Sequence, residues 1–354
     1  MHLPEAHPDA ASARVTLLVV ALGRTARLVD CLASLVAHES RTGFRIVCVV
    51  NPSDDDARAA ALIEAMPVTV VDAPLNLGWS GGVHRARAEA STDLLAWIQD
   101  DMVVLDGWLD ALVEAADSHP EVGAFGSVGV DENGAVQLFN GGHAVPGDVR
   151  AWSSTDTSLV ERPAGVTRLD WVTSRGLLLR ARAWDDIGGP DPSLFPLTFV
   201  DLDTCTHLRA HGWGIALVGE ATVLHAGNQA SPGLLREYLD ERLAPRIDER
   251  WGDAGSMPAQ TGAQHPHPCT RDRADDIEGW VAREAADIVV SFGRWAERHR
   301  RATESDLTAT QLDAHRAQAE LDAVHASRSW RLTAPLRLLR DRATGPAAPP
   351  TTTE

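Results

Sequence analysis

Acidic side chains follow two apolar segments of this chain. Asp100 and Asp101 come directly after the run Leu94–Ile98, and the cluster Asp201–Asp203 is followed further along by a lone His225. Carboxylates at the end of a strand place hard oxygen ligands beside the cleft of an α/β sheet, where a divalent cation and a phosphate can meet. The second cluster offers a base and a further ligand. These residue types therefore suggest metal-assisted chemistry.

A plainer interpretation of the first pair is structural. Acids are favoured at helix N-caps, and Asp100 and Asp101 precede the segment Met102–Leu112. Taken alone, the pair favours such a cap. The chemical interpretation therefore depends on the elements that position the two carboxylates.

The first part of the chain alternates between strand and helix patterns. Apolar, β-rich runs at Val15–Leu22, Phe44–Val50, Val68–Asp72 and Leu94–Ile98 are separated by helical patterns at Arg27–His38, Asp55–Ala65 and Gly81–Ala90. This order predicts a mostly parallel sheet between helices, with its site at the carboxyl ends of the strands. Further strands are expected at Leu169–Arg180 and Gly214–His225.

Composition excludes several classes of protein. The 354 residues are 44% hydrophobic and carry a formal charge of −18, which argues against attraction of the whole molecule to nucleic acid. The sequence contains no lysine, which excludes a Walker phosphate loop and a lysine Schiff base. A GxGxxG fingerprint is also absent, which argues against a nicotinamide enzyme. Four cysteines without metal or redox spacing are expected to be reduced and mostly buried.

The C-terminal part differs in character. Residues 252–271 are rich in Gly, Pro, Gln and His and are expected to form a linker. Residues 272–326 carry apolar positions at helical and heptad spacing, which predicts a helical hairpin or short coiled coil, and through it a homo-oligomer. Residues 327–354 begin with interleaved arginine and leucine. They fit either an interfacial membrane segment over 327–342 or a helix end that folds back on the core.

Six segments in sequence resemble glycosyltransferase family 2, the bacterial inverting sugar transferases with a GT-A fold, including rhamnosyl- and galactofuranosyltransferases. They are VCVVNPSDDD, NLGWSGGVHRARAEA, QDDMVV, DWVTSRGLLLRARAWDDIGGPDPSLFP, FVDLDTCTHLRAHGW and VLHAGNQAS. The resemblance covers roughly residues 15–231. It implies a GT-A domain over residues 15–251, after a disordered stretch at 1–14.

The resemblance also implies roles for individual residues. Asp101 and His225 would hold Mg²⁺ or Mn²⁺, and Asp201 would be the general base toward a hydroxyl acceptor. The expected donor-binding residues are Asn51, Gly78, Gly81, Gly82, Gln99 and Asp100. The donor would be a nucleotide-diphosphate-sugar and the acceptor a glycan or a lipid-linked hydroxyl, in cell-envelope or surface polysaccharide synthesis.

Three positions depart from the family pattern. Val50 and Val200 stand where relatives have acids, and Gln99 replaces another acid. Recognition of the nucleobase is therefore less predictable than catalysis, because Gln99 keeps an acceptor oxygen and Asp201 keeps its carboxylate. The same departures raise the alternative of a catalytically silent, transferase-like scaffold.

A second alternative is a serine hydrolase. Residues 78–82 spell GxSxG, and Ser80, Asp201 and His225 follow the chain order of an α/β-hydrolase triad. Against it, the strand before Ser80 ends several residues too early for a nucleophile elbow. No run of about 18 apolar residues is present and the N-terminus is acidic, so we expect a cytoplasmic protein, peripheral on the inner face of the plasma membrane if its arginine-rich segment is interfacial.

Overall fold

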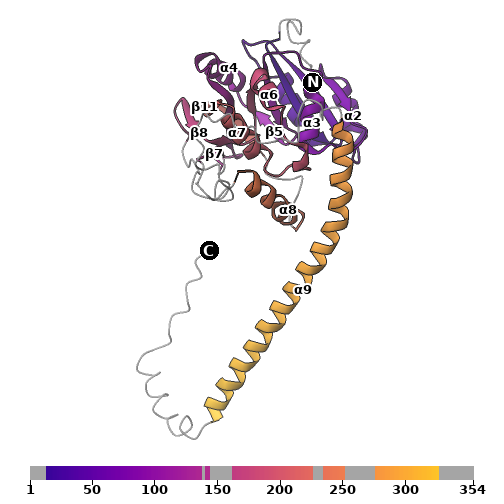
Figure 1. The fold of residues 1–354 in the computed structure, drawn as a ribbon, viewed down its shortest axis with the longest axis vertical. Coiled ribbons are helices and arrows are strands. Elements are labelled where there is room, and N and C mark those ends of the chain that lie inside the picture. The colour runs from indigo at the N-terminus through magenta and orange to yellow at the C-terminus, as the bar shows by residue number, and fades with distance from the viewer. Residues whose placement is uncertain (1–12, 138–139, 144–161, 226–233, 252–275, 327–354) are drawn as a thin grey trace. The chain divides into compact units, whose positions relative to one another are not determined.

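The computed structural model describes residues 13–137, 140–143, 162–225, 234–251 and 276–326, with side-chain surroundings up to residue 302. The chain divides into two units, residues 1–292 and 293–354 (Figure 1). The first contains β1 (Val15–Leu22), α1 (Ala26–Val36), β2 (Phe44–Asn51), α2 (Ala57–Glu64), β3 (Thr69–Asp72), α3 (Gly78–Arg87), β4 (Leu94–Gln99), β5 (Met102–Val104), α4 (Trp108–Ser118), β6 (Val122–Val130), β7 (Gly141–Gly142), β8 (Val166–Leu169), β9 (Trp171–Val172), β10 (Leu177–Arg180), α6 (Ala181–Ile187), the 3₁₀ turn η2 (Pro192–Leu194), α7 (Val200–Ala210), β11 (Gly214–His225) and α8 (Leu234–Trp251). The long helix α9 (Ile277–Ala326) begins in this unit and continues into the second.

One large sheet organises the first unit. Its strand order is β3-β2-β1-β4-β10-β6-β11-β5, with β8 paired to the first half of β11. Strands β1, β2, β3, β4, β6 and β11 run in one direction, while β10, β5 and β8 run in the other. The predicted α/β class, a mostly parallel mixed sheet between helices, is confirmed.

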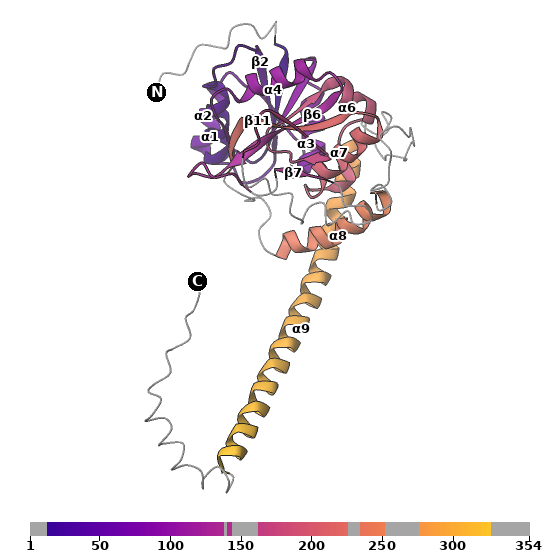
Figure 2. The same ribbon diagram turned by 90° about the vertical axis from the view of Figure 1, so that its left-hand side faces the viewer.

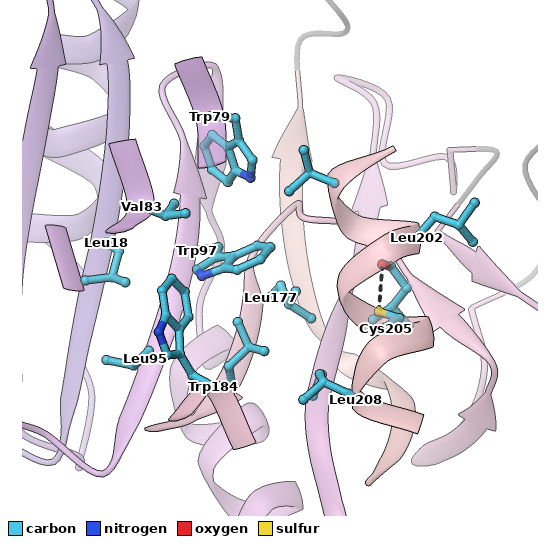
Figure 3. Packing of buried hydrophobic residues seen from close by; sticks show 14 of the residues in the cluster. Leu18, Trp79, Val83, Leu95, Trp97, Leu177, Trp184, Leu202, Cys205 and Leu208 are labelled. Atoms are coloured by element: carbon cyan, nitrogen blue, oxygen red, sulfur yellow. Dashed lines mark hydrogen bonds between the residues drawn. The ribbon is translucent and has the colours of Figure 1, made fainter. Parts of the chain in front are cut away.

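The sheet is buried on both faces because its central strands are apolar at most positions. Along β1, Leu18 and Val20 belong to one core, and Leu17 and Val19 to the other, as expected when successive side chains point to opposite faces. Helices α3, α6, α7 and α8 complete the first core, and α1, α2 and α4 complete the second (Figure 2). Trp97 of β4 lies in the middle of the first core (Figure 3).

The expected strands and helices form close to the predicted bounds, with two informative differences. The segment 169–180 is divided into β8, β9 and β10, because Thr173–Gly176 leaves the sheet as a loop. Asp100 and Asp101 form a turn that leads into the strand β5. They therefore cap no helix, since α4 begins only at Trp108, after Gly107 as its N-cap.

Helix α8 is fixed to the sheet domain by buried ion pairs. Arg250 donates to Asp203 Oδ1 at 2.7 Å and to Asp191 Oδ2 at 2.5 Å, and the Trp251 indole donates to the same Asp203 oxygen at 2.7 Å. Asp191 and Asp203 are almost inaccessible to solvent. This cluster is structural, because its carboxylates are already occupied by protein donors.

The beginning of α9 packs within the first unit. Arg242 of α8 pairs with Glu284 at 2.7 Å and with Asp287 at 2.6 Å, and the side chains of Ile277 and Val281 cover Gly81 of α3. From there α9 runs as one continuous helix of 50 residues, so the predicted hairpin does not form. The expected linker 252–271 and the arginine-rich segment 327–354 lie outside the described residues, as do residues 1–12 of the predicted disordered stretch. Within the described ranges, no helix combines the length and apolarity needed to cross a membrane.

Candidate active site

The predicted site residues gather at one edge of the sheet. Because β4 and β11 run in the same direction, Gln99 and His225 end at this edge. Strand β10 runs the other way, so the loop Thr173–Gly176 that precedes it reaches the same edge. Helix α7 brings Asp201 there, in its first turn. Four segments distant in sequence therefore supply one site.

Asp101 and His225 form a close pair. Asp101 Oδ1 lies 3.5 Å from His225 Nε2, and the two side chains are 10% and 6% exposed. The register of the sheet explains this, because β5 starts at Met102 and pairs that residue with His225. The turn that contains Asp100 and Asp101 is thus held directly beside the end of β11.

The pair fits a small divalent cation. Ligand bonds of about 2.1 Å place neighbouring ligand atoms roughly 3 to 4 Å apart, and the observed separation falls in this range. No group of three or more His, Cys, Asp or Glu side chains with metal-binding geometry occurs among the described residues. A site with two protein ligands suits Mg²⁺ or Mn²⁺ held together with substrate phosphates and water.

Asp100 points to the other side of the turn. Its Oδ2 accepts from the Leu22 N–H at 3.4 Å and lies 3.5 Å from the Arg27 guanidinium. Burial raises the pKa of Asp100, as does the neighbouring Asp101, while Arg27 lowers it. Asp100 is therefore tied to the end of β1, and its role toward a donor stays a prediction.

Asp201 occupies the first turn of α7. Its Oδ2 accepts from the Ser174 N–H at 3.2 Å, and its Oδ1 accepts from the Leu202 N–H at 3.0 Å. Burial raises the pKa of Asp201 despite these hydrogen bonds. Phe199, two residues earlier, has a φ of 63°, a conformation that costs about 1 to 3 kcal/mol outside glycine. The first turn of α7, which carries Asp201, is therefore held in place even though the conformation of Phe199 is unfavourable.

Ser174 connects Asp201 to Gln99 at the end of β4. While its N–H binds Asp201, its hydroxyl accepts from Gln99 Nε2 at 3.0 Å. Gln99 has N–H groups that can donate this hydrogen bond, whereas an ionised acid, as in the family pattern at this position, has no hydrogen to donate. Asp203, the other acid of the second cluster, faces Arg250 instead and offers no ligand to this edge.

The remaining predicted donor-binding residues lie at the start of α3 or hydrogen-bond to it, and they determine how this helix packs. Asn51 accepts from the Leu77 N–H at 2.8 Å and donates to the Gly78 carbonyl at 3.4 Å. Gly78 has a φ of +62°, and a Cβ there would meet the Pro196 oxygen at 2.6 Å. A Cβ on Gly82 would meet Val20 at 2.5 Å. Packing already requires these residues, and donor contact by Asn51, Gly78, Gly81 and Gly82 stays a prediction.

The geometry does not favour the hydrolase alternative. Ser80 lies inside α3, well beyond the end of β3, and it is 2% exposed. Its hydroxyl has no hydrogen-bond partner among the described residues, so neither Asp201 nor His225 activates it. A nucleophile elbow instead exposes its serine directly after a strand.

Sequence reasoning missed Arg175 and Gln137. Arg175 NH1 donates to Gln137 Oε1 at 2.7 Å, and Gln137 Nε2 donates to the His225 carbonyl at 2.8 Å. Arg175 lies in the family-like segment that begins at Asp170, but its residue type and spacing gave no sign of a role, and Gln137 lies in none of the six segments. The prediction of 169–180 as a single strand also missed the loop that carries Arg175.

Comparison with known proteins identifies the family of the chain. Residues 13–244 match the family described as "Glycosyltransferase like family 2". The chain is 30% identical over 221 residues to an N-acetylglucosaminyl-diphospho-decaprenol L-rhamnosyltransferase of Mycobacterium tuberculosis, a match that covers 55% of this chain and 70% of that protein. It is 27% identical over 229 residues to the O-antigen biosynthesis protein RfbC of Myxococcus xanthus, covering 62% of this chain and 18% of the longer protein.

Among solved structures, GalNAc-T7 with UDP, GalNAc and Mn²⁺ aligns with a TM-score of 0.48 at 14% identity, over 80% of this chain and 58% of the other. The family match covers well over half of the sequence and includes every predicted site residue. The chain belongs to glycosyltransferase family 2 and is, by that membership, a glycosyltransferase.

Proposed function

We propose that this chain is a metal-dependent, inverting glycosyltransferase that moves a sugar from a nucleotide-diphosphate-sugar to a hydroxyl acceptor in cell-envelope or surface polysaccharide synthesis. The observation that carries the proposal is the position of Ser174, which binds Asp201 through its N–H and Gln99 through its hydroxyl. A base and a donor-side residue are thereby held at one sheet edge, beside the Asp101–His225 pair.

Asp101 and His225 are the residues that would hold Mg²⁺ or Mn²⁺. When bound there, the ion supplies positive charge that offsets the charge developing on a departing diphosphate. Asp201 accepts the proton of the acceptor hydroxyl at its carboxylate. Because the acceptor then attacks the anomeric carbon directly, the product has the opposite anomeric configuration.

The acceptor class rests on the mycobacterial relative, whose name specifies a decaprenol-diphosphate-linked sugar. A lipid-linked acceptor would require the protein to work at the membrane surface. We therefore propose that the protein is cytoplasmic and makes peripheral contact with the membrane through residues 327–342. Self-association through α9 would present two such segments together.

The decisive experiment is a screen of nucleotide sugars with a prenyl-diphosphate-linked acceptor, with Mn²⁺ and with EDTA. We expect transfer only with metal, and inversion when the product is examined by NMR. Retained activity in EDTA together with inactivation by a serine-directed phosphonate would favour the hydrolase. Failure of every nucleotide diphosphate to bind in calorimetry with Mn²⁺ would favour the silent scaffold.

A further inference from the structure

The loop Thr173–Gly176 carries a mostly buried guanidinium that the proposed mechanism does not use. Arg175 donates from Nε to Thr173 Oγ1 at 3.3 Å and from NH1 to Gln137 Oε1 at 2.7 Å. These two contacts fix the plane of the guanidinium. The side chain is therefore anchored to its own loop and to the segment that follows β6.

Gln137 extends this contact to the end of β11. Its amide nitrogen donates to the His225 carbonyl at 2.8 Å. Gln137 is itself fixed, because its N–H donates to the Gly129 carbonyl at 2.8 Å and its carbonyl accepts from Asn140 at 2.7 Å. Arg175 thus reaches the backbone of His225 through one intermediary.

Gly129 of β6 provides the space for this network. A Cβ at this position would lie 2.9 Å from Arg175 NH1 and 3.1 Å from Gln137 Oε1. Its backbone φ is not in the left-handed region, so the case for glycine here is steric, and Asn140 Oδ1 at 3.2 Å adds to it. The two side chains therefore meet directly over the backbone of Gly129.

Arg175 follows directly after Ser174, whose N–H binds Asp201 Oδ2 at 3.2 Å, so its loop also contacts the start of α7. Burial lowers the pKa of the guanidinium, and Asp201 and Asp101 both raise it. Arginine keeps its charge under such conditions. In return, the positive charge of Arg175 lowers the pKa of Asp201.

We propose that Arg175 is a positioning residue that, through Gln137, fixes the His225 end of β11 and supplies the cationic partner of Asp201. The proposal rests on the proposed transferase function, in which His225 is a metal ligand and Asp201 the base. In this proposal, one side chain, that of Arg175, aligns the metal ligand His225 with the base Asp201. Lysine would not replace it, because a single nitrogen lacks the planar fork that reaches Thr173 and Gln137 together.

Three variants separate the two parts of this role. Gln137→Met removes the connection to His225 but keeps the charge beside Asp201. Arg175→Met removes the charge and the hydrogen bond that anchors the Gln137 side chain, and Arg175→Lys keeps only the charge. Arg180→Met is the matched control, because Arg180 lies at the opposite end of β10 and donates to the carbonyls of Val122, Ala116 and His119.

The first readout is binding of Mn²⁺ alone, followed by the EPR signal of the free ion. We expect Gln137→Met and Arg175→Met to weaken Mn²⁺ binding by about tenfold, because substitution of residues that orient metal ligands commonly has an effect of this size. Arg180→Met should leave Mn²⁺ binding unchanged. Equal Mn²⁺ affinity in all variants, or no Mn²⁺ binding by the parent protein, would overturn the part of the proposal that concerns His225.

The second readout needs no turnover. Asp201→Asn is introduced into the parent, Arg175→Met, Arg175→Lys and Gln137→Met backgrounds, and the change in melting temperature is compared. Loss of the nearby cation makes the buried carboxylate less stable, so the gain from Asp201→Asn should be larger in Arg175→Met than in the other three. Equal gains in all backgrounds would overturn the part that concerns Asp201.

The two proposals fail in different ways. If no nucleotide sugar is turned over, the proposed function falls, while Mn²⁺ binding and the melting cycle still report on Arg175. If transfer is observed but Arg175→Met behaves like Arg180→Met in both readouts, Arg175 has only a structural role.

Discussion

Ser174 presents its backbone N–H to Asp201 Oδ2 at 3.2 Å while its hydroxyl accepts from Gln99 at 3.0 Å. The end of β4 and the first turn of α7 are therefore joined by a single residue. This contact is made in a loop that ends in Gly176, whose positive φ of +64° turns the chain back into β10.

Asp201→Asn should lower turnover by about a hundred- to ten-thousandfold, because it removes the proposed base. The same change should not lower the melting temperature at pH 7. Because burial raises the pKa of this carboxyl, its protonated form stabilises the folded protein at low pH. That stabilisation is lost as the pH rises through the raised pKa, so the ionised carboxylate lowers the stability of the folded protein at pH 7. Asp106→Asn, an exposed acid before α4, is the control for both measurements. A fully active Asp201→Asn enzyme would exclude Asp201 as the base.

The acid limb of the pH profile should lie above the ordinary aspartate value of 3.8, because burial raises the pKa of Asp201. Activity should fall as the pH drops through that raised value, since the protonated acid cannot accept a proton. The measurement is kcat/KM against pH at two Mn²⁺ concentrations. A limb that moves with metal belongs to the metal ligands, whereas one that stays in place belongs to Asp201.

Arg250→Met should destabilise the protein by about 3 to 5 kcal/mol, because it leaves the buried carboxylates of Asp191 and Asp203 without their cation. Denaturant unfolding measures this loss. The control on the same helix is Arg236→Met, whose partner Asp240 has a side chain that is 43% exposed and whose removal should cost about 0.5 kcal/mol or less. Similar losses for the two variants would contradict the structural role of the Arg250 cluster.

Gly82→Ala should destabilise the protein by about 1 to 3 kcal/mol, because the new Cβ meets Val20 at 2.5 Å across the α3–β1 contact. Gly293→Ala, in a helical position with nothing within 4 Å, should instead add about 0.5 to 1 kcal/mol. Adding Val20→Ala should recover part of the loss at Gly82. A rise in the donor KM without loss of stability would point to donor binding by Gly82 instead.

Full-length protein should float with anionic liposomes, and a form that ends near residue 327 should not. The reason is the interleaved arginine and leucine of the removed segment, which suits an anionic surface. The binding should weaken as salt is raised, because exposed charges are screened. Equal flotation of the two forms would rule out membrane contact through 327–342.

Periodicity predicted β1, β2, β4 and β11, because strands buried on both faces leave continuous apolar runs. It did not predict β6, which is also buried throughout, because three glycines and Ser127 interrupt its apolar pattern. β1 and β11 begin and end where their patterns do. The cap interpretation of Asp100 was wrong because β5, only three residues long, has too short a pattern to detect. The division of 169–180 was missed for a related reason, since Ser174 and Arg175 sit in an otherwise strand-like segment.

The split within the second acidic cluster was not visible in the sequence either. Asp201 and Asp203 are two positions apart on α7 and therefore point in different directions. Only the fold shows that Arg250, which follows 47 residues after Asp203, pairs with the second acid. Distant partners of this kind have no local signature.

The contact at Ser174 has an evolutionary consequence. Asp201 is bound by a peptide N–H, which every residue except proline possesses, whereas Gln99 is bound by the side chain. Position 174 can thus exchange its hydroxyl for other groups, which would change the contact with Gln99, a proposed donor-binding residue, while the proposed base Asp201 stays held. Relatives that differ in donor should vary freely at this residue yet never carry proline there.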